Sequence, residues 1–250
     1  MRFLAAIAVV SGVVFGAQGA SAQTDETRFM LSLNGAFEPG DEAFTDDGPF
    51  TLYDEAGRLT VSGRSSTGAI LDMGVAARVA GRFTLGVSGH RGASSGDATV
   101  AGQAPHPLFF NRPRRFSVVV PETKRIEQAL HFSGGMLIAL GEKLDVHIYG
   151  GPTQFRFSQQ VVGDVLIREA NAANTAVDVT PTIVARKRNV WGGHVAADFS
   201  YPLFQIGNGV FRLGAFVRYA QASSEFQVVT NTVTTKIGAM QYGGGVRVRF

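Results

Sequence analysis

The chain has 250 residues, no cysteine, 17% charged residues and a formal net charge of +3. A disulfide-built scaffold would require cysteines, and a disordered chain would combine low hydrophobicity with high net charge, whereas 45% of these residues are hydrophobic. The excess of 23 basic over 20 acidic residues is too small for a nucleic-acid-binding surface, so no nucleic-acid partner is predicted.

Residues 1–22 have the three parts of a secretory signal peptide. A basic start at Arg2 precedes an apolar run from Phe3 to Ala17, and Ala20-Ser21-Ala22 has the small-x-small form that signal peptidase cleaves. The apolar run of about 15 residues is shorter than the roughly 20 that a membrane-spanning helix requires. We therefore predict export, cleavage after Ala22, and one mature domain that comprises residues 23–250.

Beyond the signal segment, apolar and polar residues alternate with the period of two that is typical of β-strands. Residues 71–75 are an example, because Leu71, Met73 and Val75 alternate with Asp72 and Gly74. In chain order, this pattern predicts strands at residues 27–37, 71–79, 83–90, 125–140, 144–149, 194–203, 211–219 and 240–250.

The connections between these eight segments are alternately long and short. Short turns are expected at residues 80–82, 141–143 and about 204–209. Long connections are expected at about 38–66, 95–124, 158–188 and 225–234, and residues 50–62 in the first of these could form a hairpin. Bacterial outer-membrane barrels have this asymmetry, with short periplasmic turns and longer extracellular loops.

The two faces of the expected strands differ in composition. One face carries bulky apolar residues without acids or bases, and aromatic residues gather near strand ends, as at Phe37, Trp191 and Tyr219. The other face combines small residues with charged and histidine side chains, as a narrow, side-chain-filled barrel interior requires. It predicts a polar network in the lumen that comprises Asp72, Arg78, His90, His131, Asp145, His147, His194, Asp198, Arg218 and Arg247.

Within this network, the turn at residues 80–82 places Asp72 directly opposite His90, which predicts an ion pair between them. A soluble, lipocalin-like barrel is the alternative fold. It would point its charged face to water and its apolar face inward.

The chain ends in an alternating segment, Val246-Arg247-Val248-Arg249-Phe250. With this ending and the eight alternating segments, the mature sequence resembles the small outer-membrane β-barrels of the OmpA, OmpX and OmpW type. The resemblance implies an all-β fold, an eight-stranded antiparallel transmembrane barrel in the outer membrane. It also implies that Val246, Val248 and Phe250 form the signal read by the barrel-assembly machinery.

His131-Phe132-Ser133 resembles the His-x-Ser pair of the outer-membrane lipid A deacylases, which hydrolyse an ester at the membrane surface. In that family the pair faces lipid. Here Leu130 and Phe132 occupy the lipid-facing positions, so His131 and Ser133 should point into the lumen, away from a lipid substrate. The histidines also do not converge at one height, so we predict no catalytic residue, no metal site and no cofactor.

Two features of the long connections suggest contacts. Basic residues could bind lipopolysaccharide phosphates, or could be solvated loop charge; they are Arg112, Arg114, Arg115, Arg186, Lys187 and Arg188. An apolar segment could form a lid over the barrel mouth, rest on the membrane or pack against other loops; it comprises Pro105, His106, Pro107, Leu108, Phe109 and Phe110.

The sequence therefore predicts a monomeric, non-enzymatic outer-membrane barrel with a structural or surface-interaction role in the cell envelope. Outer-membrane lipid, lipopolysaccharide and the barrel-assembly machinery are its expected partners. A narrow OmpW-like channel for small or apolar solutes is the alternative, and a lipid A-modifying hydrolase is a third hypothesis. A polar, ion-paired lumen would favour the first, and a continuous apolar lining the second.

Overall fold

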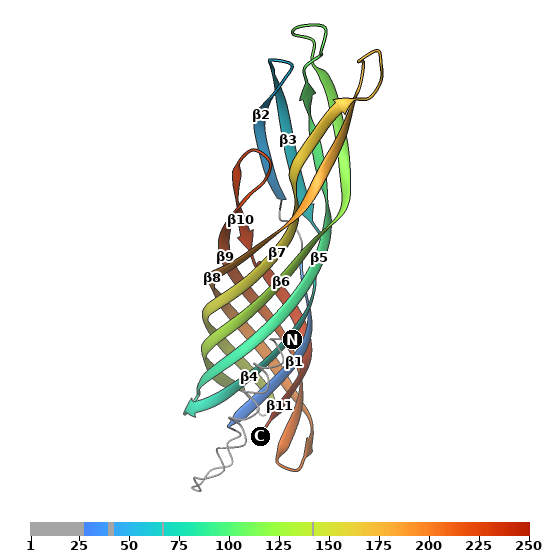
Figure 1. The fold of residues 1–250 in the computed structure, drawn as a ribbon. Helices are drawn as coiled ribbons and strands as arrows, with labels where there is room; N and C mark the ends of the chain where they lie inside the picture. The colour runs from blue at the N-terminus through green and yellow to red at the C-terminus, as the bar shows by residue number, and fades with distance from the viewer. Residues whose placement is uncertain (1–27, 40–42, 67, 142) are drawn as a thin grey trace.

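The computed structural model describes residues 28–39, 43–66, 68–141 and 143–250, so the predicted signal segment lies outside the described residues. The described chain forms eleven β-strands (Figure 1): β1 (Phe29–Glu38), β2 (Ala43–Leu52), β3 (Glu55–Ser65), β4 (Gly68–Ala80), β5 (Phe83–Ala104), β6 (Arg114–Leu140), β7 (Leu144–Glu169), β8 (Val177–Ile206), β9 (Gly209–Gln227), β10 (Thr232–Ile237) and β11 (Met240–Arg249). Within these residues, we find no helix with the length and apolar character needed to cross a membrane.

Eight of these strands form a closed antiparallel barrel. Around the ring they are β1, β11, β9, β8, β7, β6, β5 and β4, and β4 pairs again with β1. Each of the eight predicted segments overlaps one strand of this ring. The predicted eight-stranded antiparallel barrel is therefore confirmed.

Short turns and the two ends of the described barrel lie together at one end of the ring. Phe29 and Phe250 exchange two backbone hydrogen bonds of 2.8 and 3.1 Å. The three turns at this end contain Gly81, Gly141 and Gly207, each with a positive φ of 52° to 74° that glycine adopts without a Cβ clash. The turn between β8 and β9 is shorter than expected, because the strands continue to Ile206 and resume at Gly209.

The expected long loops are largely strands that continue beyond the barrel (Figure 1). β6, β7 and β8 have 27, 26 and 30 residues, whereas a membrane-spanning strand needs about 9–11. The expected hairpin in the first connection is present but longer, since β2 and β3 pair from Ala43 with Arg64 to Leu52 with Glu55. The interpretation of residues 95–124 and 158–188 as loops was therefore wrong for most of their length.

β-bulges explain why the alternation was not visible in these segments. Pairing between β5 and β6 shifts by one residue near Gly96, and Glu122 on β6 has a positive φ of 57°. A second shift lies near Gly163 on β7, where Val161 and Val162 are both buried. Each bulge inserts a residue that reverses the order of inward and outward side chains, so a strict period of two ends there.

Outward side chains of the ring are apolar along its whole lower part. Large exposed apolar residues of this band include Leu31, Leu33, Leu71, Met73, Leu85, Phe132, Met136, Ile148, Val195, Phe199, Leu213 and Val246. Aromatic side chains occur at both borders, as with the stacked pair of Phe37 and Tyr242 at one border and Phe204 and Phe211 at the other. A soluble barrel would bury these residues, so the lipocalin-like alternative is wrong and the apolar band is the surface that contacts lipid.

Above the band the polarity is reversed, and the strands enclose an apolar core. Its buried members are Phe44, Leu59, Val61, Ala98, Val100, Val161, Val162, Val179, Phe226 and Val228, from β2, β3, β5, β7, β8 and the end of β9. These residues face inward because water surrounds this part of the protein. The extension is therefore a packed structure in its own right.

Asp46 joins the two sides of this extension. Its carboxylate accepts hydrogen bonds from the backbone N–H of Thr230 at 2.8 Å and the side-chain amide of Asn231 at 2.8 Å, in the turn between β9 and β10. Burial opposes ionisation of Asp46, but these hydrogen bonds outweigh it and lower its pKa below the ordinary value. The ionised carboxylate thus connects β2 to a hairpin with which it shares no ladder.

Candidate functional site

The lumen is filled by ion pairs near the end with the short turns. Arg247 is fully buried, and its guanidinium donates two hydrogen bonds to Asp198, at 3.1 and 2.5 Å to Oδ2, and one to Asn34 Oδ1 at 2.5 Å. A Cβ on Gly214 would lie 2.5 Å from Arg247 Nε, so the glycine provides the space for this guanidinium. A buried arginine requires this kind of pairing, because an uncompensated buried charge is very costly.

A second pairing group lies beside the first. Asp145 Oδ2 accepts a hydrogen bond from Arg249 Nη1 at 2.5 Å and forms an ion pair with Arg212 Nη2 at 2.6 Å. Arg212 also donates to the hydroxyl of Ser200 at 3.1 Å. These residues come from β7, β8, β9 and β11, so the charges bridge strands that are not all adjacent in the ring.

Arg218 is the centre of the next layer. Its side chain is 1% exposed and donates to Asp72 Oδ2 at 2.8 Å, to Gln241 Oε1 at 2.7 Å and to His90 Nδ1 at 3.2 Å. Asp72 also accepts from Asn34 Nδ2 at 2.9 Å. The predicted register of Asp72 opposite His90 is confirmed. The predicted ion pair between them was wrong, because Arg218 from β9 binds both residues and the carboxylate that faces His90 Nε2, at 3.5 Å, is that of Glu127.

Three histidines form a hydrogen-bonded chain across this layer. His90 Nδ1 lies 2.9 Å from His131 Nε2, His131 Nδ1 lies 2.8 Å from Thr153 Oγ1, and that hydroxyl lies 2.9 Å from His194 Nδ1. Since Arg218 donates to His90 Nδ1, that nitrogen accepts, and the His131 Nε2–H donates to it. The chain joins β5, β6, β7 and β8 across the lumen, and at its β5 end His90 Nε2 lies 3.5 Å from Glu127 Oε1.

Apolar side chains close the lumen above the histidines. Phe155 and Phe157 on β7 pack with Ala129, Ala220, Ala222 and Ile237 in one buried cluster. The Phe155 ring lies edge-on to His131 at 6.3 Å. Three cavities along the barrel have volumes of about 20 to 30 Å³, each enough for about one water molecule. This lumen therefore resembles a core more than a channel.

The structure directs all ten residues of the expected lumen network into the barrel. His147 stands apart from the histidine chain and contacts Thr84 Oγ1 at 2.7 Å. Sequence reasoning left out other lumen members: Asn34, Glu38, Arg125, Glu127, Thr153, Arg212, Gln241 and Arg249. Arg212, Gln241 and Arg249 alternate in phase with Arg218 and Arg247, and that signal could have identified them.

His131 and Ser133 also point inward. His131 is fully buried, whereas Phe132 between them is 38% exposed on the lipid-facing side. His131 is engaged with His90 and Thr153, so the geometry offers no serine nucleophile activated by this histidine at a lipid surface. In the described part of the chain, no group of three or more His, Asp or Glu residues has an arrangement that could hold a metal ion.

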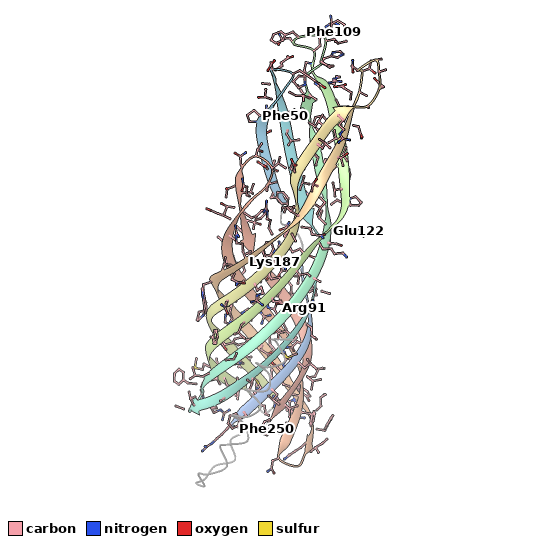
Figure 2. The ribbon with its side chains drawn as sticks, in the orientation of Figure 1. Phe50, Arg91, Phe109, Glu122, Lys187 and Phe250 are labelled. Carbon is pink, nitrogen blue, oxygen red and sulfur yellow. The ribbon has the colours of Figure 1, made fainter. Side chains whose placement is uncertain are left out.

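The apolar segment from Pro105 to Phe110 lies at the far end of the extension, as the position of Phe109 shows in Figure 2. Leu108, Phe109 and Phe110 are 71%, 54% and 76% exposed. The expected lid over the barrel mouth is therefore wrong, as is rest on the membrane, because β5 and β6 carry the loop away from both. We call residues 105–113 the distal loop.

Neighbouring hairpins hold the distal loop in place. Arg114 donates to the Pro105 carbonyl at 2.6 Å and forms an ion pair with Glu169 at the end of β7. The backbone N–H of Asn111 donates to Glu55 Oε1 at 2.9 Å, at the start of β3. The hydrogen bond from Arg114 lowers the pKa of Glu169. Two neighbouring hairpins, β2–β3 and β7–β8, thus fix the base of a loop whose apolar side chains stay in water.

The basic residues from the long connections occupy two different places. Arg112 and Arg115 are exposed near the distal loop, whereas Arg114 is buried in its ion pair. Lys187 lies on β8, much closer to the apolar band, as Figure 2 shows, and its neighbour Arg188 donates to the Glu225 carbonyl at 3.2 Å. The β8 group therefore lies closer to the apolar band than the residues around the distal loop do.

Comparisons with known proteins assign no role to this chain. No protein-family model matches the sequence, and no curated protein sequence does. Similar solved structures include the outer membrane protein OprG from Pseudomonas aeruginosa, with 10% identity over 91% of this chain and 99% of that chain and a TM-score of 0.40. The outer membrane protein AlkL has 14% identity over 93% and 94% of the two chains, with a TM-score of 0.40. Ail of Yersinia pestis, solved with a heparin analogue, has 8% identity over 88% and 99%, with a TM-score of 0.30.

The fold is that of a small outer-membrane β-barrel. This conclusion rests on the closed ring of eight strands, the apolar band around it and the paired charges within it. The protein is located in the outer membrane. The short-turn end then faces the periplasm and the extension faces the cell exterior.

Proposed function

We propose that this protein is a non-enzymatic surface-contact protein of the cell envelope. The barrel anchors a rigid extension, and the extension presents the distal loop away from the membrane. The observation that carries the proposal is the distal loop, where three large apolar side chains remain exposed although neighbouring hairpins hold the loop. Exposed apolar patches of this kind are typical of interaction sites.

Attachment of cells that display the protein tests this proposal. We expect the Leu108→Ser, Phe109→Ser, Phe110→Ser variant to lose most of its attachment to a host-cell monolayer, because these side chains supply the apolar contact. The control is Val119→Ser, which removes an exposed apolar residue from β6 at 58% exposure, away from the loop. Unchanged attachment by the triple variant at equal surface levels would contradict the proposed contact.

The channel hypothesis is less well supported, because side chains fill the lumen. Ion pairs around Arg247 and Arg218 and the Phe155–Phe157 layer leave cavities of about one water molecule. We expect refolded mature protein in planar bilayers to give no reproducible conductance steps. Steps that change in Asp72→Ala would instead support a channel, provided that heat-modifiable gel mobility confirms a folded barrel.

The proposal includes assembly as a monomer by the barrel-assembly machinery. Ring closure leaves no unpaired strand edge within the apolar band, so a partner subunit is not needed to cover one. Val246 points outward, and the Phe250 ring packs against Phe29 at 6.0 Å, where the last strand closes the barrel.

Deletion of Phe250 should slow assembly and leave a periplasmic precursor, because the expected signal and the contact with Phe29 are both lost. Pulse-chase labelling with heat-modifiable mobility as the readout measures this. Deletion of Phe250 should slow assembly more than Phe29→Ala does, because Phe29→Ala removes only the contact between the two rings. Normal surface levels of the deletion variant would count against the assembly signal.

A further inference from the structure

The distal loop presents apolar side chains at the end of the molecule that is farthest from its own membrane. Figure 2 shows Phe109 at this end and Phe250 at the other, with Arg91 between them. From Arg91, β5 continues to Ala104, a strand length of about 40 Å at roughly 3.3 Å per residue. A surface that approaches the cell therefore meets the distal loop first, and the loop cannot reach the membrane that holds the barrel.

The apolar part of the loop projects as one uncharged segment. Pro107 is half-buried, whereas the next three side chains, Leu108, Phe109 and Phe110, are largely exposed. Residues 105–111 contain no Asp, Glu, Lys or Arg. Three adjacent apolar groups without a charge among them gain free energy when they leave water for an apolar medium.

Phe109 is held between two polar side chains. Its ring lies 4.9 Å from the ring of His106, and the guanidinium carbon of Arg112 lies over it at 5.7 Å from the ring centroid. A cation over an aromatic face is attracted to it, so the ring is oriented before a partner binds. The polar ends of His106 and Arg112 can stay among lipid headgroups while the ring enters the apolar layer.

The backbone of the loop satisfies several of its donors internally. Pro107 has no N–H, and the Leu108 N–H donates to His106 Nδ1 at 3.1 Å. The Asn111 N–H donates to Glu55 Oε1 at 2.9 Å. A donor without a partner is costly in hydrocarbon, because lipid offers no hydrogen bond in exchange for water. A protein partner could supply such hydrogen bonds itself, so internal satisfaction favours a lipid partner.

The exposed charges near the loop have both signs. They come from the loop and from the two hairpins that hold it, and they are Arg112, Arg115, Arg168, Asp54 and Asp178. Arg168 and Asp178 are opposite each other on β7 and β8. A surface that selects an anionic partner would carry bases alone, whereas zwitterionic headgroups carry both a phosphate and an ammonium group. The mixed charges therefore complement a zwitterionic surface.

We propose that the distal loop inserts Leu108, Phe109 and Phe110 into a facing, zwitterionic lipid bilayer. This step rests on the surface contact proposed above and assigns lipid as its partner. Each loop should bind weakly and reversibly, since even a single acyl chain gives only marginal membrane binding. Many copies on one cell would act together and strengthen the contact.

Co-flotation with lipid vesicles tests the insertion. Refolded mature protein in nanodiscs is mixed with phosphatidylcholine vesicles, and the fraction of protein that floats with the vesicles is measured, with heat-modifiable mobility as the check for folding. The loop variant is Leu108→Ser, Phe109→Ser, Phe110→Ser. The matched control removes three exposed apolar side chains from the walls of the extension: Val119→Ser, Leu166→Ser, Ile183→Ser.

The loop variant should float with the vesicles at least about tenfold less than the native protein, because each apolar side chain contributes to partitioning into lipid. The control variant should float as the native protein does. Equal flotation with and without anionic phosphatidylglycerol in the vesicles is expected, because the charges near the loop have both signs.

A fluorescent label measures whether the loop enters the bilayer. The chain has no cysteine, so Phe110→Cys allows the environment-sensitive dye NBD to be attached at one position. Its fluorescence should increase when vesicles are added. The same label on Val119→Cys, an exposed position on β6, should not respond.

Insertion is contradicted if the native protein does not float, if the two triple variants float equally, if flotation requires phosphatidylglycerol, or if the label at position 110 does not respond. Loop-dependent attachment to host cells without vesicle binding would retain the surface contact and assign its partner as a protein or glycan, which overturns insertion. Vesicle binding without loop-dependent attachment would instead refute the surface contact.

Discussion

Replacing Arg218 by leucine is expected to destabilise the folded barrel by about 3–5 kcal/mol, the cost typical of breaking a buried ion pair. The guanidinium is the shared donor to Asp72, Gln241 and His90, at 2.8, 2.7 and 3.2 Å. Leucine would leave the Asp72 carboxylate buried with Asn34 as its remaining neutral donor. Urea unfolding in phospholipid vesicles, followed by the fluorescence of Trp191, the single tryptophan, measures the loss.

Two further variants separate the ion pair from general effects of the substitution. Arg218→Leu combined with Asp72→Leu removes both charges and should recover part of the lost stability, because no uncompensated charge remains. Arg91→Leu removes an exposed arginine and should change the stability by about 0.5 kcal/mol or less in the same vesicles. If the double variant is less stable than Arg218→Leu alone, the ion pair is not the cause.

Introducing arginine at Leu33 is expected to cost about 2–4 kcal/mol and to impair insertion, because the charge would lie at the bilayer midplane. Leu33 is 55% exposed, faces outward and lies halfway between Phe29 and Phe37, the aromatic residues near the two borders of β1. Reversible folding into vesicles, with heat-modifiable mobility as the readout, gives both the yield and the midpoint.

Depth provides the control for this prediction. Leu213→Arg makes the same change at the same exposure, but Leu213 pairs with Tyr201 and lies two residues from Phe211, close to one border. The cost there should be smaller, because the arginine side chain reaches the interface. Equal costs at Leu33 and Leu213 would contradict the assigned position of the apolar band.

Much of the barrel could be predicted from alternation alone, because it is a local property. A strand between lipid and a polar lumen must place apolar and polar residues on opposite faces, and Leu71, Asp72 and Met73 show this directly in the sequence. Alternation no longer predicts strands where its period changes. Beyond the bulges near Glu122 and Gly163, water replaces lipid outside and the faces reverse, so the upper parts of strands of up to 30 residues were interpreted as loops.

The contacts within the lumen could not be predicted from the sequence, because each of them joins side chains from distant strands. Asp72 and His90 were correctly aligned across a turn, yet both bind Arg218, more than a hundred residues away.

By itself, the sequence determined the number of ring strands, the inward or outward direction of their side chains and the end of the barrel that carries the short turns. These follow from the two environments that each strand meets and from local turn chemistry. Only the tertiary structure decided which lumen charges pair and where the extension presents its distal loop. Closure of the ring decides these because it sets the stagger between strands, and this stagger brings distant residues to the same height.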